Sequence, residues 1–278
     1  MSDGPMKVRI TRRVAFSSGH RYWLTSKSDE ENRDLFGRWA SKFNHGHNYV
    51  LDVTVEGEVD PRTGMVVNIK RIDDVLQEKI VQAFDQKSLN DEVDYFAKWA
   101  PSVENILTYV QELLSAPGTL PGECALVALK LEEMPTFYGE LELGGKMSLT
   151  RVYEFAASHR LHSPALSDEE NLELFGKCNN PAGHGHNYVL EVTVAGVPDP
   201  VTGMLTDLGA VDEVVRREVV DRYDHKNLNE DLPEFEGKTT TSEVVAAQIF
   251  STLKGKVPGQ LARIRLHETA RNSFEVSA

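Results

Sequence analysis

The stretch Cys178-Asn-Asn-Pro-Ala-Gly-His184-Gly-His186-Asn-Tyr188 decides how the rest of the chain is interpreted. After Tyr188 two sets of residues alternate along the chain, as is typical of a β-strand. Side chains two apart on a strand share a face, so His184 and His186 can bind one ion. His159 ends another strand-like run and is the candidate third ligand. Three neutral imidazoles with an open fourth position form a catalytic zinc arrangement.

A His-x-His pair alone is weak evidence, because many histidines are ordinary surface or core residues. Here the whole set occurs twice. A shift of 139 residues superposes His20 on His159, His45 on His184 and His47 on His186. The same shift aligns Thr63-Gly64-Met65 with Thr202-Gly203-Met204, and the register holds from about residue 16 to 90. The chain is therefore a two-copy duplication, not a solenoid of short repeats.

Length and composition agree with two domains. The chain has 278 residues, and each copy is long enough to bury its own core. No apolar run is long enough to span a membrane, and the N-terminus lacks a signal-peptide pattern. Cys124 and Cys178 are the only cysteines and are not equivalent in the two copies, which favours a reduced, cytoplasmic setting. The net charge of −13 argues against general nucleic-acid binding.

Each copy is predicted to fold in the order ββααββ, an α+β domain with an antiparallel sheet and both helices on one face. Residues 21–44 are polar and are predicted to form a long loop. The first copy spans 1–143 and the second 147–278. The predicted strands are 7–18, 47–56, 125–132, 137–143, 148–158, 186–196, 260–268 and 272–277, and the predicted helices are 69–84, 102–114, 208–222 and 241–253.

Four segments of the second copy together resemble the 6-pyruvoyl-tetrahydropterin synthase family. These are Ser158–Ser163, Leu166–Asn171 and Phe175–Tyr188, followed by Asp224–Leu228. The resemblance covers about 148–277, and the first copy resembles the same family over about 7–143. It implies the tunnelling fold, or T-fold, in which ββααββ domains join their sheets into a ring-shaped barrel.

The resemblance also implies the reaction. 7,8-Dihydroneopterin triphosphate loses triphosphate and rearranges to 6-pyruvoyl-tetrahydropterin, with no net redox change and Zn²⁺ as the only cofactor. Zinc on the three histidines would act as a Lewis acid on the substrate side chain. The resemblance makes Cys178 the base, and a thiolate beside zinc is chemically reasonable. Asp224 and His225 would form a second proton carrier.

Two residues are candidates for pterin binding. Glu268 lies in the strand where the family anchors the pterin, and a carboxylate matches adjacent N–H donors. Thr241 is a further candidate, although it also fits a simple helix cap. Taken alone, Cys178 would be a small buried residue, Glu268 an ordinary strand carboxylate, and Asp224-His225 a helix end.

The first copy departs from the family pattern where the chemistry is done. The 139 shift places Trp39 against Cys178 and Gln86 against His225. Neither side chain shuttles protons near neutral pH. The candidate metal ligands His20, His45 and His47 remain, as do Asp85 and Glu133. We interpret this copy as a degenerate domain that binds zinc and a pterin, or whose histidines are only structural.

Two alternatives to the synthase stay open. One is 6-carboxytetrahydropterin synthase of the queuosine route, which uses a similar metal site and substrate. The other is a zinc- and pterin-binding protein without turnover, against which the pair Cys178 and His225 argues. The sequence does not settle the physiological product, because that depends on the shape of the pocket.

The duplication limits how the chains assemble. The resemblance implies rings of domains in which Cys178 and the Asp224-His225 pair of one site come from neighbouring domains. Three chains would build two stacked rings of like copies, and two chains would build one ring with the copies alternating. In the alternating ring each site would lack one proton carrier. An active protein is therefore predicted to be a homotrimer of roughly 93 kDa, three times the 31.1 kDa chain.

Overall fold

The computed structural model describes residues 6–278, and the chain divides into two compact units. Unit 1 comprises the chain up to Leu149 together with Gly196–Leu205, and unit 2 comprises Thr150–Ala195 and Thr206–Ala278. The units thus largely follow the two sequence copies. The main exception is the segment 196–205, which belongs to the second copy in sequence but to unit 1 in the structure. The domain boundaries 1–143 and 147–278, which come from the sequence repeat, remain a prediction. Within the described residues, no helix has the length and apolar character that crossing a membrane requires.

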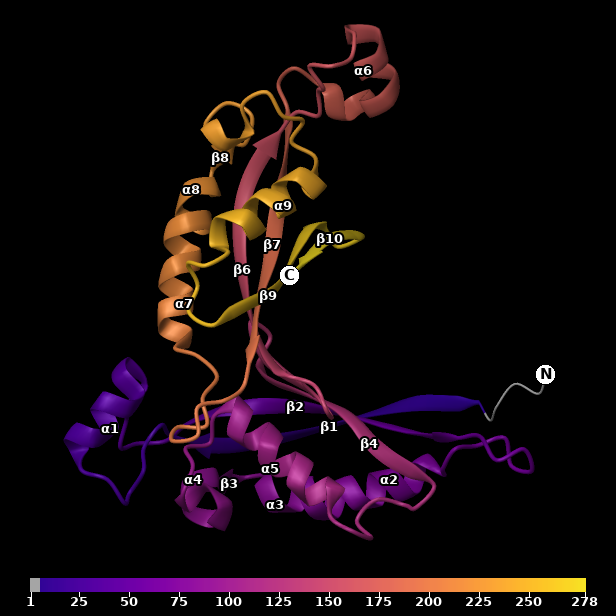
Figure 1. Ribbon diagram of the computed structural model, residues 1–278, viewed down its shortest axis with the longest axis vertical. Coiled ribbons are helices and arrows are strands. Elements are labelled where there is room, and N and C mark those ends of the chain that lie inside the picture. The colour runs from indigo at the N-terminus through magenta and orange to yellow at the C-terminus, as the bar shows by residue number, and fades with distance from the viewer. Residues whose placement is uncertain (1–5) are drawn as a thin grey trace. The chain divides into compact units, whose positions relative to one another are not determined.

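Unit 1 is an antiparallel sheet with helices on one face (Figure 1). Its strand order is β5-β4-β2-β1, and the short β3 pairs in parallel with β1. The strands are β1 (Lys7–His20), β2 (His45–Glu58), β3 (Lys87–Ser88), β4 (Cys124–Met134) and β5 (Phe137–Glu142). The helices that follow β2 are α2 (Ile69–Leu76), α3 (Gln82–Phe84), α4 (Leu89–Glu92) and α5 (Val103–Ser115), with a π-helical segment Gln77–Val81 between α2 and α3.

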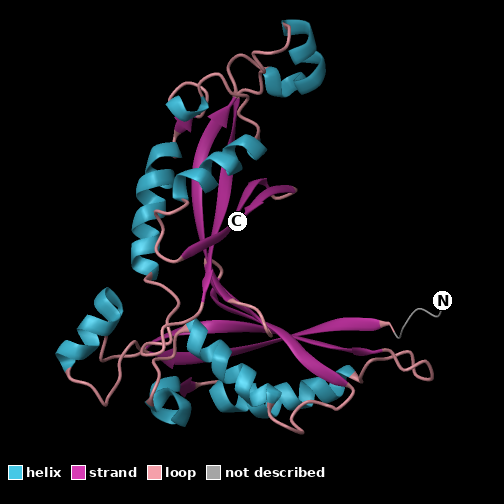
Figure 2. Ribbon diagram, viewed as in Figure 1, coloured by secondary structure: helices cyan, strands magenta, loops and turns pink. Residues whose placement is uncertain are grey.

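Unit 2 repeats this plan with the order β10-β9-β7-β6, and β8 pairs in parallel with β6. Figure 2 shows the same grouping of helices beside strands in this unit. The strands are β6 (Met147–His159), β7 (His184–Gly196), β8 (Lys226–Asn227), β9 (Gln260–Thr269) and β10 (Asn272–Ser277). The helices are α6 (Asp168–Phe175), α7 (Leu208–Val215), α8 (Asp221–Tyr223) and α9 (Ser242–Leu253), and a π-helical segment, Arg216–Val220, lies between α7 and α8. The predicted α+β fold class is confirmed.

The alternation along β7 decides where the histidines point. Tyr188, Leu190, Val192 and Val194 are all buried, with at most 1% of each residue exposed. His184 and His186 share the parity of this set, so their side chains lie on the face that packs the core. In unit 1 the register of β1 with β2 places His20 opposite His45. A one-residue slip would turn every one of these side chains to the other face.

The prediction of a loop over 21–44 is wrong in its middle. Residues Asp29–Phe36 form α1, and a 3₁₀ turn, Gly37–Trp39, follows it. Ser28 accepts the N–H of Glu31 while the Glu31 carboxylate accepts the N–H of Ser28, a capping box that satisfies two helix-end groups. The second copy repeats this as α6 with Ser167 and Glu170. The helix was missed because it is short and mostly polar.

Candidate functional site

Three histidines meet in unit 2 where two strand ends lie side by side. His159 is the last residue of β6, and His184 and His186 open β7, its hydrogen-bonded neighbour. Each histidine offers one ring nitrogen to the cluster, and these three nitrogens all lie within 4.8 Å of one another. The ring centroids of His159 and His184 are 4.6 Å apart. The strand ends therefore bring together the three residues that the sequence singled out.

The hydrogen bond of His159 fixes which nitrogen faces the cluster. Its Nδ1 lies 2.8 Å from the carbonyl oxygen of Thr240, which only accepts, so Nδ1 carries the proton. Its Nε2 is left with a lone pair, is buried and has no hydrogen-bond partner. His184 Nδ1 and His186 Nε2 are buried without a hydrogen-bond partner as well. Burial lowers the pKa of His159 and of His184, which favours the neutral, metal-binding form.

These observations fit a metal ion on the three histidines. A buried ring nitrogen without a hydrogen-bond partner destabilises the folded state unless a ligand such as a metal ion binds it. Three imidazoles oriented by a backbone carbonyl are a donor set suited to zinc and related transition metals. The described residues thus contain a candidate metal centre, and the donor set alone does not distinguish one such metal from another.

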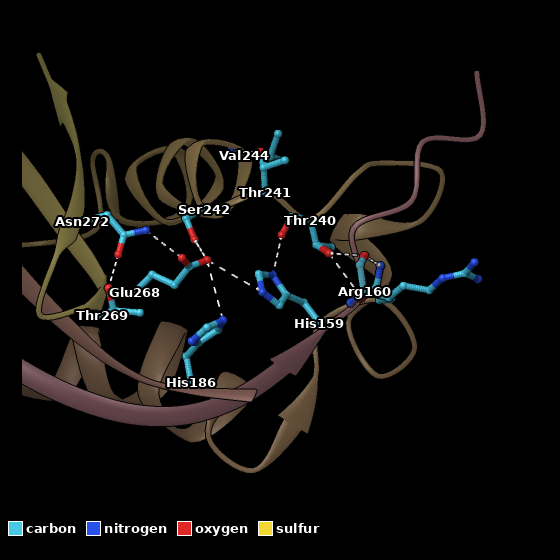
Figure 3. A network of polar contacts seen from close by, with 11 residues as sticks. His159, Arg160, His186, Thr240, Thr241, Ser242, Val244, Glu268, Thr269 and Asn272 are labelled. Atoms are coloured by element: carbon cyan, nitrogen blue, oxygen red, sulfur yellow. Dashed lines mark hydrogen bonds and ion pairs between the residues drawn. The ribbon is translucent and has the colours of Figure 1, made fainter. Parts of the chain in front are cut away.

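Glu268 lies beside the histidines and is held by two side chains (Figure 3). Ser242 Oγ donates to its Oε1 at 2.7 Å, and Asn272 Nδ2 donates to its Oε2 at 2.8 Å. His159 Nε2 and His186 Nε2 lie 3.7 and 3.9 Å from Oε1, too far for hydrogen bonds. Burial acts to raise the pKa of Glu268, but the two hydrogen bonds and the histidines lower it, so the carboxylate is ionised at neutral pH.

Ser242 and Asn272 were not identified from the sequence. Ser242 follows Thr241 at the start of α9, and Asn272 opens β10. Neither position has a motif of its own, because their role follows from the approach of two elements to Glu268. Thr241 is the N-cap of α9, where its Oγ1 accepts the N–H of Val244 at 3.4 Å. Figure 3 shows Thr241 turned away from Glu268.

Asp224 and His225 form a closely joined pair. His225 Nδ1 lies 2.8 Å from Asp224 Oδ2, and the N–H of Ala156 donates to Asp224 Oδ1 at 2.7 Å. These bonds lower the pKa of Asp224, with the contact from Ala156 the larger cause. The His225 side chain is 84% exposed and lines an open cavity together with His186. The pair can therefore exchange protons with a molecule in that cavity.

Cys178 is half-buried in a 3₁₀ turn, Gly176–Asn179, that follows α6. Its carbonyl accepts the N–H of Leu161 at 2.9 Å, which ties the turn to the chain beyond β6. Within residues 6–278 no polar contact joins its thiol to the histidines or to His225. The unit alone thus brings His186 and His225 to one cavity but does not bring Cys178 to them.

Unit 1 keeps the metal-type cluster and changes the groups around it. The ligand atoms of His20, His45 and His47 again lie within 4.8 Å of one another. His20 Nδ1 lies 2.6 Å from the carbonyl oxygen of Pro101, and its Nε2 is buried without a hydrogen-bond partner. Burial lowers the pKa of His20 to about 3 and that of His47 to about 4.

The proton-carrying positions of unit 1 hold other residues in the same backbone. Gln86 has a positive φ of 56°, close to the 59° of His225 at the equivalent position. The Arg38 guanidinium lies 4.5 Å from the ring centroid of Trp39, which replaces the cysteine. The two copies therefore share the local conformation at these positions, and only the second has acid–base side chains there.

Comparison with known proteins accounts for both halves of the chain. A family model for 6-pyruvoyl tetrahydropterin synthase matches residues 9–143 and again 148–278. The 6-pyruvoyl tetrahydrobiopterin synthase of Poecilia reticulata is 49% identical over 125 residues, which are 45% of this chain and 85% of that protein. The human protein of the same name is 47% identical over 125 residues, which are 45% of this chain and 86% of the human protein.

The 6-pyruvoyl tetrahydropterin synthase of Caenorhabditis elegans is 42% identical, with 48% of this chain and 96% of that chain covered and a TM-score of 0.47. The Poecilia reticulata and human proteins each match a stretch about as long as one of the two copies. The chain belongs to the 6-pyruvoyl tetrahydropterin synthase family, as a tandem duplication of its domain.

Proposed function

We propose that the protein is a zinc-dependent 6-pyruvoyl-tetrahydropterin synthase whose second copy carries the activity. The observation that carries the proposal is the set of orphaned nitrogens of His159, His184 and His186 beside the ionised Glu268. The substrate is 7,8-dihydroneopterin triphosphate, and the reaction is a carbon–oxygen lyase reaction that releases triphosphate. This function is expected from the family and supported by the geometry of unit 2.

The metal would be held by the three histidines and would supply Lewis-acid polarisation of the substrate side-chain hydroxyls. The carbonyl of Thr240 keeps Nε2 of His159 available to it. Zinc rather than another metal is our assignment from the all-imidazole donor set.

The chain's own residues would divide the remaining work. Glu268, fixed by Ser242 and Asn272, presents carboxylate oxygens to the adjacent N–H donors of a pterin ring. Cys178 acts as the base that removes a proton from the substrate side chain. Asp224 orients His225, which gives or takes a second proton. Thr241 keeps its role as a helix cap and, in this proposal, only borders the pterin.

In the first copy we propose a metal site without turnover. His20, His45 and His47 retain orphaned nitrogens on two of the three rings. Glu133 lies 3.6 Å from His47 Nε2 and accepts from Tyr49 Oη at 3.5 Å. The equivalent of Ser242 is Val103, which has no hydroxyl to donate. The carboxylate is therefore held by different partners, and no acid–base pair accompanies it.

The rest of the proposal concerns the setting. We propose that the protein acts in the cytoplasm, as its cysteine usage leads us to expect. We also propose that its partner is a small molecule and neither nucleic acid nor a membrane. The homotrimer predicted from the sequence remains part of the proposal, and sedimentation equilibrium of an active preparation tests it, with roughly 93 kDa expected from three chains of 31.1 kDa.

Incubation of the purified chain with 7,8-dihydroneopterin triphosphate tests the proposal. We expect a pterin with a three-carbon pyruvoyl side chain and release of triphosphate. A 6-carboxy product with acetaldehyde would instead identify the queuosine-route enzyme. Binding of the pterin without any product would identify a binding protein.

A further inference from the structure

Glu133 lies beside the histidine cluster of unit 1, as Glu268 lies beside that of unit 2. Its Oε1 is 3.6 Å from His47 Nε2, and its Oε2 is 3.9 Å from His20 Nε2. Within residues 6–278 neither of these buried ring nitrogens has a hydrogen-bond partner. Glu133 is itself only 8% exposed. A buried carboxylate therefore presents one oxygen to each of two orphaned nitrogens.

These spacings are close to the spacing between two ligands of one metal ion. Zinc lies about 2.0–2.2 Å from a histidine nitrogen or a carboxylate oxygen, so two such atoms on a tetrahedral ion are roughly 3.4 Å apart. A small rotation of the Glu133 carboxylate would bring its oxygen to that spacing. Distance alone does not distinguish the two units, because Glu268 Oε1 lies 3.7 and 3.9 Å from its own histidines.

Hydrogen bonds to the carboxylate distinguish the units. In unit 2 Ser242 donates to Glu268 Oε1 at 2.7 Å, and Asn272 donates to Oε2 at 2.8 Å (Figure 3). The oxygen held by Ser242 is the one nearest to His159 and His186. Both oxygens are thus fixed by side chains of the protein, which keeps the carboxylate in place as an acceptor for a substrate beside the metal.

Both of these donors are replaced by carbon side chains in unit 1. Val103 stands at the position of Ser242, one residue after the N-cap of its helix. Phe137 stands at the position of Asn272, the first residue of the strand that pairs with the strand of the carboxylate. Neither side chain can donate a hydrogen bond. The positions that hold Glu268 for a substrate therefore cannot do the same for the carboxylate of unit 1.

A buried tyrosine instead draws the unit 1 carboxylate toward the histidine strand. Tyr49 Oη donates to Glu133 Oε2 at 3.5 Å, whereas in the described part of the chain its counterpart Tyr188 Oη makes no hydrogen bond. Tyr49 follows His47 by two residues on β2, so both side chains lie on one face of the strand. The hydrogen bond therefore orients the carboxylate toward the cluster.

We propose that Glu133 is the fourth protein ligand of a metal ion held by His20, His45 and His47. The proposal rests on the first-copy metal site of the proposed function, whose fourth ligand it identifies. Four protein ligands form a closed site of the structural kind, whereas the three histidines of unit 2 leave a position open for a substrate. The first copy then takes no pterin, because the carboxylate that would bind the pterin ring binds the metal instead.

Cobalt in unit 1 tests the fourth ligand without reference to turnover. His184→Ala with His186→Ala removes the unit 2 site, so the full chain loaded with Co²⁺ reports unit 1. We expect about one cobalt ion per chain and a visible spectrum that azide leaves unchanged. On this background Glu133→Gln should make the spectrum respond to azide. It should also lower Co²⁺ affinity at least about tenfold, since loss of an outer-shell partner alone costs roughly 10–100-fold.

The matched control carries His45→Ala and His47→Ala, so that cobalt reports unit 2. Its spectrum should respond to azide without any further change, because the fourth position is open there. Glu268→Gln on this background should leave Co²⁺ affinity nearly unchanged, since this carboxylate is not a ligand. Circular dichroism of each chain verifies that it is folded.

The outcomes separate the fourth ligand from the rest of the proposed function. A unit 1 spectrum that responds to azide while Glu133 is intact would overturn the fourth ligand. So would a folded Glu133→Gln chain with unchanged Co²⁺ affinity and no azide response. Either result would leave the three-histidine site and the activity of unit 2 standing. A unit 1 that holds no cobalt would overturn both the fourth ligand and the first-copy metal site, whereas product analysis tests unit 2 independently.

Discussion

At the scale of single residues, the two copies form an internal comparison. The same backbone holds a cysteine in one copy and a tryptophan in the other, and a histidine in one and a glutamine in the other. Because the fold around these positions is shared, a difference in their effects on turnover reports chemistry and not local structure. Residue-level predictions can therefore be made in matched pairs.

The first pair concerns the base. Cys178→Ala should lower kcat by at least about two orders of magnitude, the usual contribution of a positioned acid or base. Trp39→Ala should leave turnover nearly unchanged in a chain that still folds. Steady-state kinetics with circular dichroism as a folding control measures both. Equal losses from the two variants would contradict the division into an active and an inactive copy.

The second residue-level prediction concerns pH. Burial lowers the pKa of His20 to about 3 from its ordinary 6.5. Between these values the unfolded chain binds the proton and the folded chain does not, so stability falls as pH decreases from 6.5 toward 3. Chelator-treated protein should show this as a falling Tm over that range. His20→Gln should show a shallower fall, and an identical pH dependence would refute the buried neutral imidazole.

At the scale of elements, the eight long strands were predictable from sequence, whereas the two-residue strands β3 and β8 and the contacts between elements were not. The alternation after Tyr188 and the 139-residue repeat placed β7, β2 and the histidine clusters correctly, because the two-residue period fixes which face each side chain takes. Ser242 and Asn272 could not be found this way. They reach Glu268 only because α9 and β10 both lie against β9.

The short helices mark another limit. The 21–44 segment looked like a loop because α1 depends on the capping box at Ser28 and on the buried Asn32 rather than on an apolar stripe. Asn32 donates to the carbonyl of Leu24 and accepts its N–H, which anchors the helix to the preceding chain. A capping signature of this kind identifies a helix only when it is searched for directly.

Helix anchoring gives a prediction at this scale. In unit 2, Asp212 of α7 pairs with Arg151 of β6 at 2.9 Å and accepts from Tyr153 Oη at 2.8 Å, and it is largely buried. In unit 1 the equivalent Asp73 pairs with Arg12, and both side chains are considerably more exposed. Asp212→Ala leaves a half-buried guanidinium without this partner and should cost about 3 kcal/mol.

The matched control is Asp73→Ala, which should cost less than about 1 kcal/mol because exposed ion pairs contribute little. Urea denaturation of the two variants beside the wild type measures both changes. The prediction fails if Asp73→Ala destabilises the chain as much as Asp212→Ala does.

At the scale of the whole molecule, two metal-type clusters stand in one chain while only one has acid–base groups beside it. We expect about two metal ions per chain after gentle purification. His186→Ala should remove one ion and abolish turnover. His47→Ala should remove the other ion and leave turnover largely intact. Elemental analysis alongside activity measures this, and a wild-type chain without metal would contradict the assignment of both sites.

The account depends most directly on the reaction of the second copy. The decisive measurement is identification of the pterin formed when the metal-loaded wild type and Cys178→Ala are each incubated with 7,8-dihydroneopterin triphosphate. The account predicts 6-pyruvoyl-tetrahydropterin and triphosphate from the wild type, and almost none from the variant. Recovery of unchanged substrate from the wild type, or of a 6-carboxy pterin with acetaldehyde, would contradict it.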